Sequence, residues 1–505
     1  MENSRIKKAS KNIVWLVIYE LTAFVCNLIL PRLIISTYGS AYNGLISSIT
    51  QFMNFVAILR LGVAGATRVA LYKSLADDDI EKTSAIVRAT ELYMRRIGYI
   101  ILGFIATLAI IYPLIIKKEF GFVNTAVLIV AIGIGTFSQY FFGITYRTLL
   151  QADQRLYITN IVQILTIALN TALSAFLITR GCSIQVVKIV YAVIFTISPI
   201  LLNRYVIAKY KLTKKCTPDF SALDRKKDVM GHSIANIVHE NTDIIVLTLF
   251  TDIKFVSVYT VYNLVMSGLK QIMSIFTTGI EAVFGNMWAK GEMESIKKNL
   301  SYYEFLISVF ISVMFSATII LILPFVKLYT RGVTDIEYII PAYAVIITIA
   351  QAFYCFRVPY LTVTQAAGHY KETRNGAFFE AGLNLFISIV LVQFIGILGT
   401  AIGTLCANLF RTIQYSVYTS DKLIMRKRIY IVKRLIWVVL NIVIAVSVVY
   451  LLFGEMAYAD WGKWVIVGFA SVIIGFAICI ITSYLFYKED AKGLMHIGKR
   501  VLRRK

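Results

Sequence analysis

The stretch that decides the fold is MGHSIANIVHENTDIIVLTLF, residues Met230–Phe250, an apolar helical segment with charged side chains near its middle. On insertion scales a central Asp costs about 2.5 to 3.5 kcal/mol, whereas each Ile, Leu, Val or Phe returns about 0.3 to 0.6 kcal/mol. The insertion cost of Glu240 and Asp243 therefore exceeds the free energy gained from the apolar side chains of this helix. At helical spacing one face carries Asn236, Glu240, Asp243 and Leu247. If the segment spans a membrane, this face must look into a protein interior or a wet cavity, which makes Glu240 and Asp243 functional candidates.

Two other interpretations of this stretch are available. The acids can be protonated or paired with basic residues, in which case they only lock helices together. A helical zinc site would need the motif H-E-x-x-H, but Asp243 replaces its second histidine. Six cysteines, at positions 26, 182, 216, 355, 406 and 479, have no metal or redox spacing. The sequence therefore predicts no metal and no cofactor, although Na⁺ or H⁺ can couple to transport at the acids.

The composition indicates an all-α integral membrane protein. The chain has 505 residues, of which 58% are hydrophobic and 16% are charged. Many apolar stretches are long enough to cross a bilayer core of about 30 Å. We predict fourteen transmembrane helices, at residues 13–35, 43–70, 97–116, 122–144, 156–179, 184–208, 231–251, 256–284, 302–329, 338–362, 376–396, 398–420, 435–453 and 463–487. The first lacks a small-residue cleavage site, so we interpret it as a retained helix.

The distribution of basic residues predicts that both termini lie in the cytoplasm. An even number of spans places the termini on one side of the membrane, and most Lys and Arg residues fall on that side. The opposite side receives Lys117, Lys118, Arg180, Lys254, Lys327, Arg331 and Lys463. Cytoplasmic loops carry such an excess. The net charge of +23 then reflects this bias and attraction to anionic lipids, and implies no nucleic-acid partner.

An internal repeat divides the chain. A shift of 214 positions aligns YRTLLQADQRLYITNIVQILTIALNTALS, from Tyr146, with YLTVTQAAGHYKETRNGAFFEAGLNLFIS, from Tyr360. A shift of 215 aligns SLADDDIEK with AKGEMESIK, so two stretches give nearly the same offset. Each copy holds six spans, which predicts two six-helix bundles of like orientation, as in parallel-repeat transporters. The predicted domains are a bundle at 1–212, a cytoplasmic connector at 213–229, a bundle at 230–420, and two extra helices with a basic tail at 421–505.

Basic residues inside or at the ends of these spans are the candidates for substrate binding. Under the 214 shift Arg60 aligns with Ser274, one helical turn after Lys270, so we predict that Arg60 and Lys270 form a facing cationic pair. The other candidates are Arg32, Arg147, Arg357, Arg374 and Arg411. The acids that can titrate or neutralise them are Glu20, Glu240, Asp243 and Glu380. Each cation can instead extend to the headgroups or form an ion pair. A cationic cavity favours anions, and arginine suits phosphate.

Two segments resemble a known family. They are TYGSAYNGLISSITQFMNFVAILRLGVAGATRVALYKSLADDD, Thr37–Asp79, and ENTDIIVLTLFTDIKFVSVYTVYN, Glu240–Asn263. They resemble the polysaccharide-transporter branch (Wzx-type flippases) of the multidrug/oligosaccharidyl-lipid/polysaccharide exporter superfamily. The resemblance covers most of the chain. It implies a V-shaped pair of bundles that flips an undecaprenyl-pyrophosphate-linked oligosaccharide from the inner to the outer leaflet of the bacterial cell membrane. It also implies that spans 1, 2, 7 and 8 line the cavity, while spans 13 and 14 contact the polyprenyl tail or only pack.

The resulting hypothesis is alternating-access export for cell-surface polysaccharide, without catalysis. The partners implied are the lipid-linked oligosaccharide, membrane lipids and polysaccharide assembly proteins. A multidrug or cation antiporter of the same fold is one alternative. It predicts an acidic cavity, whereas Arg and Lys are in surplus within the spans. A membrane glycan polymerase or ligase is the other. It needs a large catalytic outer loop, and the predicted outer loops are short and carry no nucleophile or phosphate-binding motif.

Overall fold

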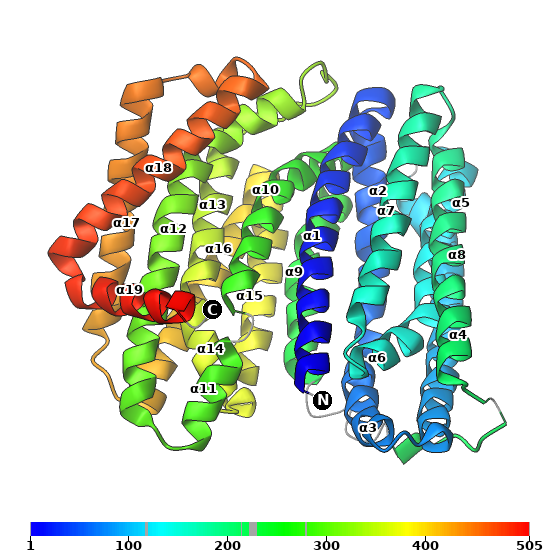
Figure 1. Ribbon diagram of the computed structural model, residues 1–505. Helices are drawn as coiled ribbons and strands as arrows, with labels where there is room; N and C mark the ends of the chain where they lie inside the picture. The colour runs from blue at the N-terminus through cyan, green and yellow to red at the C-terminus, as the bar shows by residue number, and fades with distance from the viewer. Residues whose placement is uncertain (1, 117–119, 214, 222–229, 278–279, 504–505) are drawn as a thin grey trace. The chain divides into compact units, whose positions relative to one another are not determined.

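The structure is a computed structural model that describes residues 2–116, 120–213, 215–221, 230–277 and 280–503. Helices make up the regular structure of these residues, and no strand occurs among them. The chain divides into two compact units, Met1–Ile245 and Val246–Lys505. Within each unit most of the long helices run side by side (Figure 1). The all-helical membrane class predicted from composition is confirmed.

The first unit contains helices α1 to α8 and most of α9. Their bounds are α1 Glu2–Tyr38, α2 Ser40–Asn54, η1 Phe55–Arg60, α3 Val63–Ala76, α4 Ile80–Ile115, α5 Phe122–Ser138, η2 Gln139–Gly143, α6 Ile144–Ala152, α7 Leu156–Thr179, α8 Ile184–Tyr210 and α9 Met230–Phe250. Helix α1 packs against α7, and α5 packs against α4 and α8. A buried apolar cluster that includes Leu71, Ile86, Leu149 and Val206 joins α3, α4, α6 and α8. This cluster holds in place the helices that border the candidate site.

The second unit contains the remaining helices. Their bounds are α10 Ile253–Thr277, α11 Ile280–Ala289, α12 Met293–Tyr329, α13 Pro341–Phe356, α14 Val358–Ala366, α15 Tyr370–Ile395, α16 Ile397–Tyr418, η4 Thr419–Ile424, α17 Ile429–Phe453, η5 Met456–Tyr458, α18 Trp461–Phe486 and α19 Lys488–Arg503. Helix α12 contacts α13, α17 and α18. Helices α15 and α16 approach closely because Gly399 has no side chain: a Cβ there would lie 2.4 Å from the backbone N of Val392.

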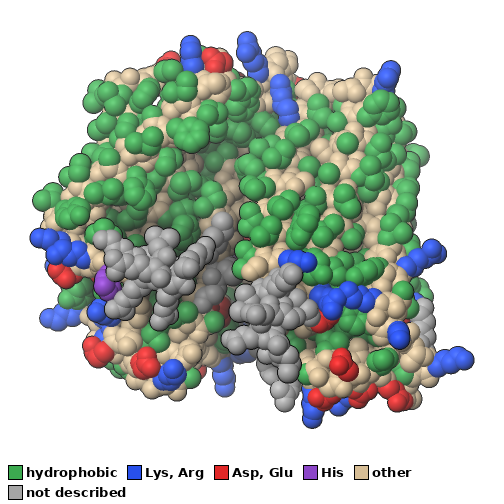
Figure 2. Space-filling view, in the orientation of Figure 1, with side chains coloured by type: hydrophobic (Ala, Val, Ile, Leu, Met, Phe, Trp, Pro, Cys, Tyr) green, Lys and Arg blue, Asp and Glu red, His purple; other side chains and the backbone are tan. Residues whose placement is uncertain are grey.

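Most of the predicted spans coincide with membrane-length helices. Ten described helices are long and apolar enough to cross a membrane, and the bent pair Ser40–Arg60 and Val63–Ala76 makes up to eleven. The predicted spans 231–251 and 398–420 fall on α9 and α16, and 256–284 covers most of α10 and the start of α11; these helices are not among the candidates. Their polar side chains make them less apolar, so these three spans stay predictions. In each unit, on the face that Figure 2 shows, hydrophobic side chains cover the middle and charged ones lie toward the ends.

Three helices begin well before the predicted spans. Helix α1 starts at Glu2, against a predicted start at 13, α4 starts at Ile80, against 97, and α12 starts at Met293, against 302. Their first turns are charged, so an apolar pattern cannot mark where they begin. The start of α4 is set by a cap instead, because the side chain of Asp79 accepts a hydrogen bond of 2.9 Å from the backbone N–H of Lys82.

The repeat is visible in matching local structure. Gln154 and its 214-shift partner Gly368 both have positive φ, 58° and 77°, in the turns after α6 and α14. Ser174 donates to the Oδ1 of Asn170 at 3.4 Å, and its partner Ser388 donates to Asn384 at 2.9 Å. Equivalent residues therefore form the same kind of turn and the same kind of hydrogen bond in the two copies. The parallel relation of the bundles and the domain bounds 1–212, 230–420 and 421–505 stay predictions, and most of the 213–229 connector lies outside the described residues.

Candidate functional site

A polar cavity of about 500 Å³ in the first unit brings two of the predicted cations together. Arg60, the last residue of η1, and Arg147, on α6, both line it. The other polar side chains of the lining are Thr50, Asn54, Thr136, Gln139, Tyr140, Thr148, Gln151 and Tyr191. No carboxylate belongs to the lining among the described residues. We call this the Arg60–Arg147 cavity.

Irregular turns place these side chains. The bent pair changes direction at Gly62, whose φ of 78° suits glycine, directly after the short 3₁₀ helix that ends at Arg60. On the facing helix a π-helical turn, η2, separates α5 from α6, and its residues Gln139 and Tyr140 line the cavity. Such turns occur often at functional sites. The guanidinium carbon of Arg60 lies 5.9 Å from the ring centroid of Tyr140, which holds the cation by a cation–π contact.

The charge of the cavity favours anions. Its two guanidinium groups have no carboxylate beside them in the lining to offset their charge. The surrounding hydroxyl and amide groups can donate hydrogen bonds to phosphate or sugar oxygens without adding negative charge. A cavity of this kind repels organic cations and suits a phosphorylated or polyhydroxylated group.

The second unit has a buried ion cluster built from three of the predicted residues. Arg357, at the break between α13 and α14, donates through Nη1 to Oε1 of Glu380 on α15. Arg411 on α16 reaches the other carboxylate oxygen, with an Nε to Oε2 distance of 3.3 Å. Only 5% of Arg357, 6% of Glu380 and 2% of Arg411 is exposed. The pairs that could not be assigned from the sequence are therefore Arg357–Glu380 and Arg411–Glu380.

Lys270 joins this cluster through an aromatic ring. The Nζ of Lys270 lies 5.0 Å from the ring centroid of Tyr354, and the guanidinium carbon of Arg357 lies 4.7 Å from the same centroid. Lys270 is partly exposed, whereas Arg357 is not. Two arginines, one lysine and one glutamate leave the cluster positively charged, with Lys270 as its accessible end.

The predicted polar face of α9 is exposed at one position and buried at another. Glu240 is exposed and Asp243 is buried, although the two lie on one side of the helix. The neighbouring Asn241 accepts a hydrogen bond of 2.5 Å from Nε2 of Gln51 on α2. This bond ties the polar part of α9 to α2 within the first unit.

Comparison with known proteins identifies the architecture. No family model and no curated protein matches the chain. The lipid II flippase MurJ, in an inward closed conformation, matches with a TM-score of 0.70 and 15% sequence identity over 94% of this chain and 99% of that one. An inward-facing multidrug resistance MATE family transporter of the MOP superfamily matches with a TM-score of 0.62 and 14% identity over 81% and 98%. The chain has the fold of the MOP superfamily.

The MOP fold is also matched in a second state. An outward-facing multidrug resistance MATE family transporter of that superfamily matches with a TM-score of 0.57 and 13% identity, over 83% of this chain and 96% of the transporter. These three neighbours are a flippase and two transporters, and none is an enzyme. At such low identities the likeness establishes the fold alone.

The remaining predicted residues lie on this MOP fold as follows. Arg32 is partly buried on α1, directly after Pro31, and Glu20 is exposed on the same helix. Arg374 is exposed on α15. Arg60 and Lys270 belong to different units, so their facing arrangement stays a prediction.

Sequence reasoning missed the neutral members of the site. Gln139 and Tyr140 sit in an aromatic run, FSQYFFG, which looks like ordinary core. Tyr354 likewise follows AQAF in an apolar helix. One signal was available: Gln151 lies four residues after Arg147 and so shares its helix face.

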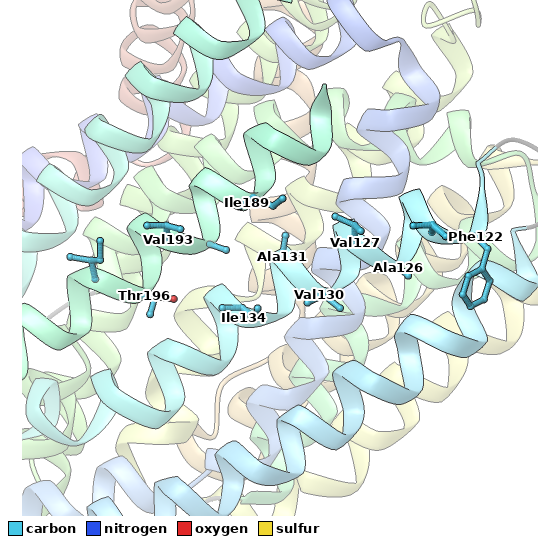
Figure 3. Close-up of a pocket in the computed structure, with 12 residues that line it drawn as sticks. Phe122, Ala126, Val127, Val130, Ala131, Ile134, Ile189, Val193 and Thr196 are labelled. Carbon is cyan, nitrogen blue, oxygen red and sulfur yellow. The ribbon is translucent and has the colours of Figure 1, made fainter. Parts of the chain in front are cut away.

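A second cavity in the first unit has the opposite character. It measures about 680 Å³ and lies between α5 and α8. Figure 3 shows its lining, from Phe122 and Val130 on α5 to Ile189 and Val193 on α8, with the Thr196 hydroxyl as the one polar side-chain group among the twelve residues drawn. Such a surface suits hydrocarbon and cannot compensate a charged headgroup.

Proposed function

We propose that this protein is a flippase that moves undecaprenyl-pyrophosphate-linked oligosaccharide repeat units from the inner to the outer leaflet, for export of cell-surface polysaccharide. The observation that carries the proposal is the Arg60–Arg147 cavity, which presents two guanidinium groups and no carboxylate within a membrane-spanning unit. The MOP fold shared with a lipid II flippase supports it. Bidentate arginine pairs recognise phosphate groups of this kind.

Transport proceeds by alternating access. The bundles 1–212 and 230–420 rock against each other, the 213–229 segment connects them, and the lipid tail stays in the bilayer while the headgroup crosses. Inward-facing and outward-facing MATE structures that match this chain support two such states. Spans 13 and 14, at 435–453 and 463–487, contact the tail or only pack. The protein acts in the bacterial cell membrane with both termini cytoplasmic, alongside polysaccharide assembly proteins.

The substrate is held by cations from both bundles. In the first bundle Arg60 and Arg147 bind the pyrophosphate, and Arg32 is a further candidate. In the second bundle Lys270 is the accessible cation, and the buried Arg357 and Arg411 hold positive charge behind it. Arg374, which is exposed, meets the headgroup near the entrance.

The membrane potential supplies a driving force. Moving one elementary charge down a potential of 100 mV releases about 2.3 kcal/mol of free energy. Export of a doubly charged pyrophosphate from a negative interior therefore releases about twice that. Na⁺ or H⁺ exchange is the other source. Glu240, Asp243 and Glu20 are the acids for it, whereas Glu380 is already paired with two arginines. A multidrug antiporter needs a site for organic cations, which the charge of this cavity opposes.

Deletion of the gene tests the substrate. The proposal expects loss of surface polysaccharide and accumulation of an undecaprenyl-pyrophosphate-linked oligosaccharide in the inner leaflet, identified by mass spectrometry of extracted lipids. Accumulation of unlinked sugars, or resistance changes toward cationic drugs with normal polysaccharide, would contradict it.

Variants of the cavity test the site. Arg60→Gln and Arg147→Gln each lower export about tenfold or more, since a hydrogen bond to a charged group contributes about 1.5 to 3 kcal/mol. Arg60→Lys is the matched control, because it keeps the charge and loses only the planar fork. It retains more export than Arg60→Gln at equal membrane expression. Equal activity of the glutamine and lysine variants would refute a role for this charge.

A further inference from the structure

A second charged cavity lies in the second unit, at the ends of the two C-terminal spans. It measures about 820 Å³ and is bordered by α12, the start of α17, the end of α18 and the start of α19. One wall is apolar, with Ile436 and Leu440 on α17 and Leu485 and Phe486 on α18, all exposed. The other wall carries Arg426, Lys433, Arg434, Lys488 and three acids, Glu304, Glu489 and Asp490. We call it the Arg434 cavity.

Arg434 is buried in this cavity, where its guanidinium carbon lies 4.0 Å from the ring centroid of Tyr487 and one of its nitrogens lacks a hydrogen-bond partner. Only 4% of the residue is exposed, and its Nη2 donates to the Oδ2 of Asp490 at 2.7 Å. Its Nη1 has no hydrogen-bond partner among the described residues, and neither has the Nε1 of the equally buried Trp437. Buried donors without partners cost free energy. The Nε of Arg426 is a third such donor in the lining, and together the three indicate that an acceptor belongs there.

The net charge of the cavity favours an anionic acceptor, and two of its three acids are already paired. Glu304 accepts two hydrogen bonds from the guanidinium of Arg426, and Asp490 accepts from Arg434 and, at 2.9 Å, from Ser301. Four cations and three carboxylates line the cavity, so one positive charge is left over. Lys433 is exposed at the rim, where it can meet a further anion.

The cavity lies at the ends of two candidate membrane spans, where lipid headgroups are expected. Helices α17 and α18 are both long and apolar enough to span a membrane, and the cavity sits where α17 begins at Ile429 and α18 ends at Phe486. Helix α19 follows at once and lies across α12 and α18 (Figure 1). Burial raises the pKa of Tyr487, directly after α18, although the charge of Arg434 opposes this. The phenol therefore stays protonated and can donate. Aromatic and basic side chains gather at this depth in membrane proteins.

We propose that the Arg434 cavity binds the phosphate of an anionic glycerophospholipid, with the acyl chains along the exposed apolar sides of α17 and α18. The phosphate accepts from Arg434 and Trp437 and is attracted by Lys433, in the manner of basic pockets that hold lipid headgroups between helices. The site is separate from the proposed transport cavity and does not depend on it. The lipid fastens α19 and the C-terminal spans to α12.

The test uses the full-length protein in detergent and counts bound lipids by native mass spectrometry. The probes are phosphatidylglycerol, phosphatidylcholine with the same acyl chains, and inorganic phosphate as a competitor. Lys433→Gln weakens phosphatidylglycerol binding about fivefold or more. The matched control is Lys427→Gln, which removes the same charge from an exposed position that does not line the cavity. It changes binding less than about twofold.

Trp437→Phe gives an independent readout. Phe keeps the ring that stacks on Phe305, at 5.6 Å between centroids, but removes the Nε1 donor. It weakens phosphatidylglycerol binding and leaves the fold intact, as circular dichroism can verify. Equal binding of phosphatidylcholine, equal effects of Lys433→Gln and Lys427→Gln, or full displacement by millimolar inorganic phosphate would each overturn the proposal. The last outcome would assign the cavity to a free anion.

Discussion

Replacing Glu380 by glutamine should destabilise the second unit strongly. The substitution keeps the size of the side chain but removes the negative charge that two buried guanidinium groups share. Arg411 keeps other partners, since it donates to the backbone O of Thr373 at 3.0 Å and to the Tyr415 hydroxyl at 2.7 Å. Arg357 keeps its contact with the Tyr354 ring and a neutral amide oxygen as acceptor, and its Nε has no partner among the described residues. Most of the lost unfolding free energy therefore comes from Arg357, whose buried charge is left without a counter-charge.

The expected loss is about 3 to 5 kcal/mol of unfolding free energy, the cost of leaving a buried charge without its partner. Burial makes this larger than for a surface pair, because little solvent reaches any of the three groups. The assay is denaturant unfolding in detergent micelles, followed by circular dichroism. Glu372→Gln is the control, an exposed acid in the first turn of the same helix, and it should change stability by less than about 0.5 kcal/mol. Equal stability of the two variants would refute the buried cluster.

Two further predictions concern helix packing and the cationic pair. Gly399→Ala should destabilise the protein by about 1 to 3 kcal/mol, because the added methyl group meets backbone atoms of α15. Gly382→Ala, at a helical position with nothing within 4 Å of the added Cβ, should instead raise stability by up to about 1 kcal/mol, and thermal unfolding of both variants checks the contrast. If Arg60 and Lys270 hold one phosphate group, the double variant Arg60→Gln plus Lys270→Gln should lose less export than the two single losses added together as free energies. Strictly additive losses in the same polysaccharide assay would show that the two residues act at separate sites.

Most of the helical architecture could be predicted from the sequence, because the length of each apolar stretch and the offset of the repeat can be read directly from the residues. The 214-residue shift led directly to the paired turns at Gln154 and Gly368. Helix starts outside the apolar layer were not available from the same signal. The first turns of α4 and α12 are polar, and their beginnings depend on caps and turns such as Asp79.

The site was only partly accessible from the sequence. Charged residues within apolar helices stand out, so Arg60 and Arg147 were found, and the structure brings both to one cavity. Which acid neutralises which base depends on how each helix is rotated about its axis, and periodicity does not specify that across a packed bundle. The Glu380 bridge between Arg357 and Arg411 therefore needed the structure.

The π-helical turn η2 has a consequence for engineering and for alignment. Such a turn holds one residue more than an α-helix would over the same rise. Removing a single residue within Gln139–Gly143 would therefore restore regular α-helical geometry while α6 keeps the face that Arg147 presents to the cavity. Removing a residue from the regular helix α5 would instead turn the following residues by about 100° about the helix axis and take Arg147 out of the cavity. A relative that lacks the extra residue would show a one-position gap at this turn and would keep an equivalent of Arg147 in place.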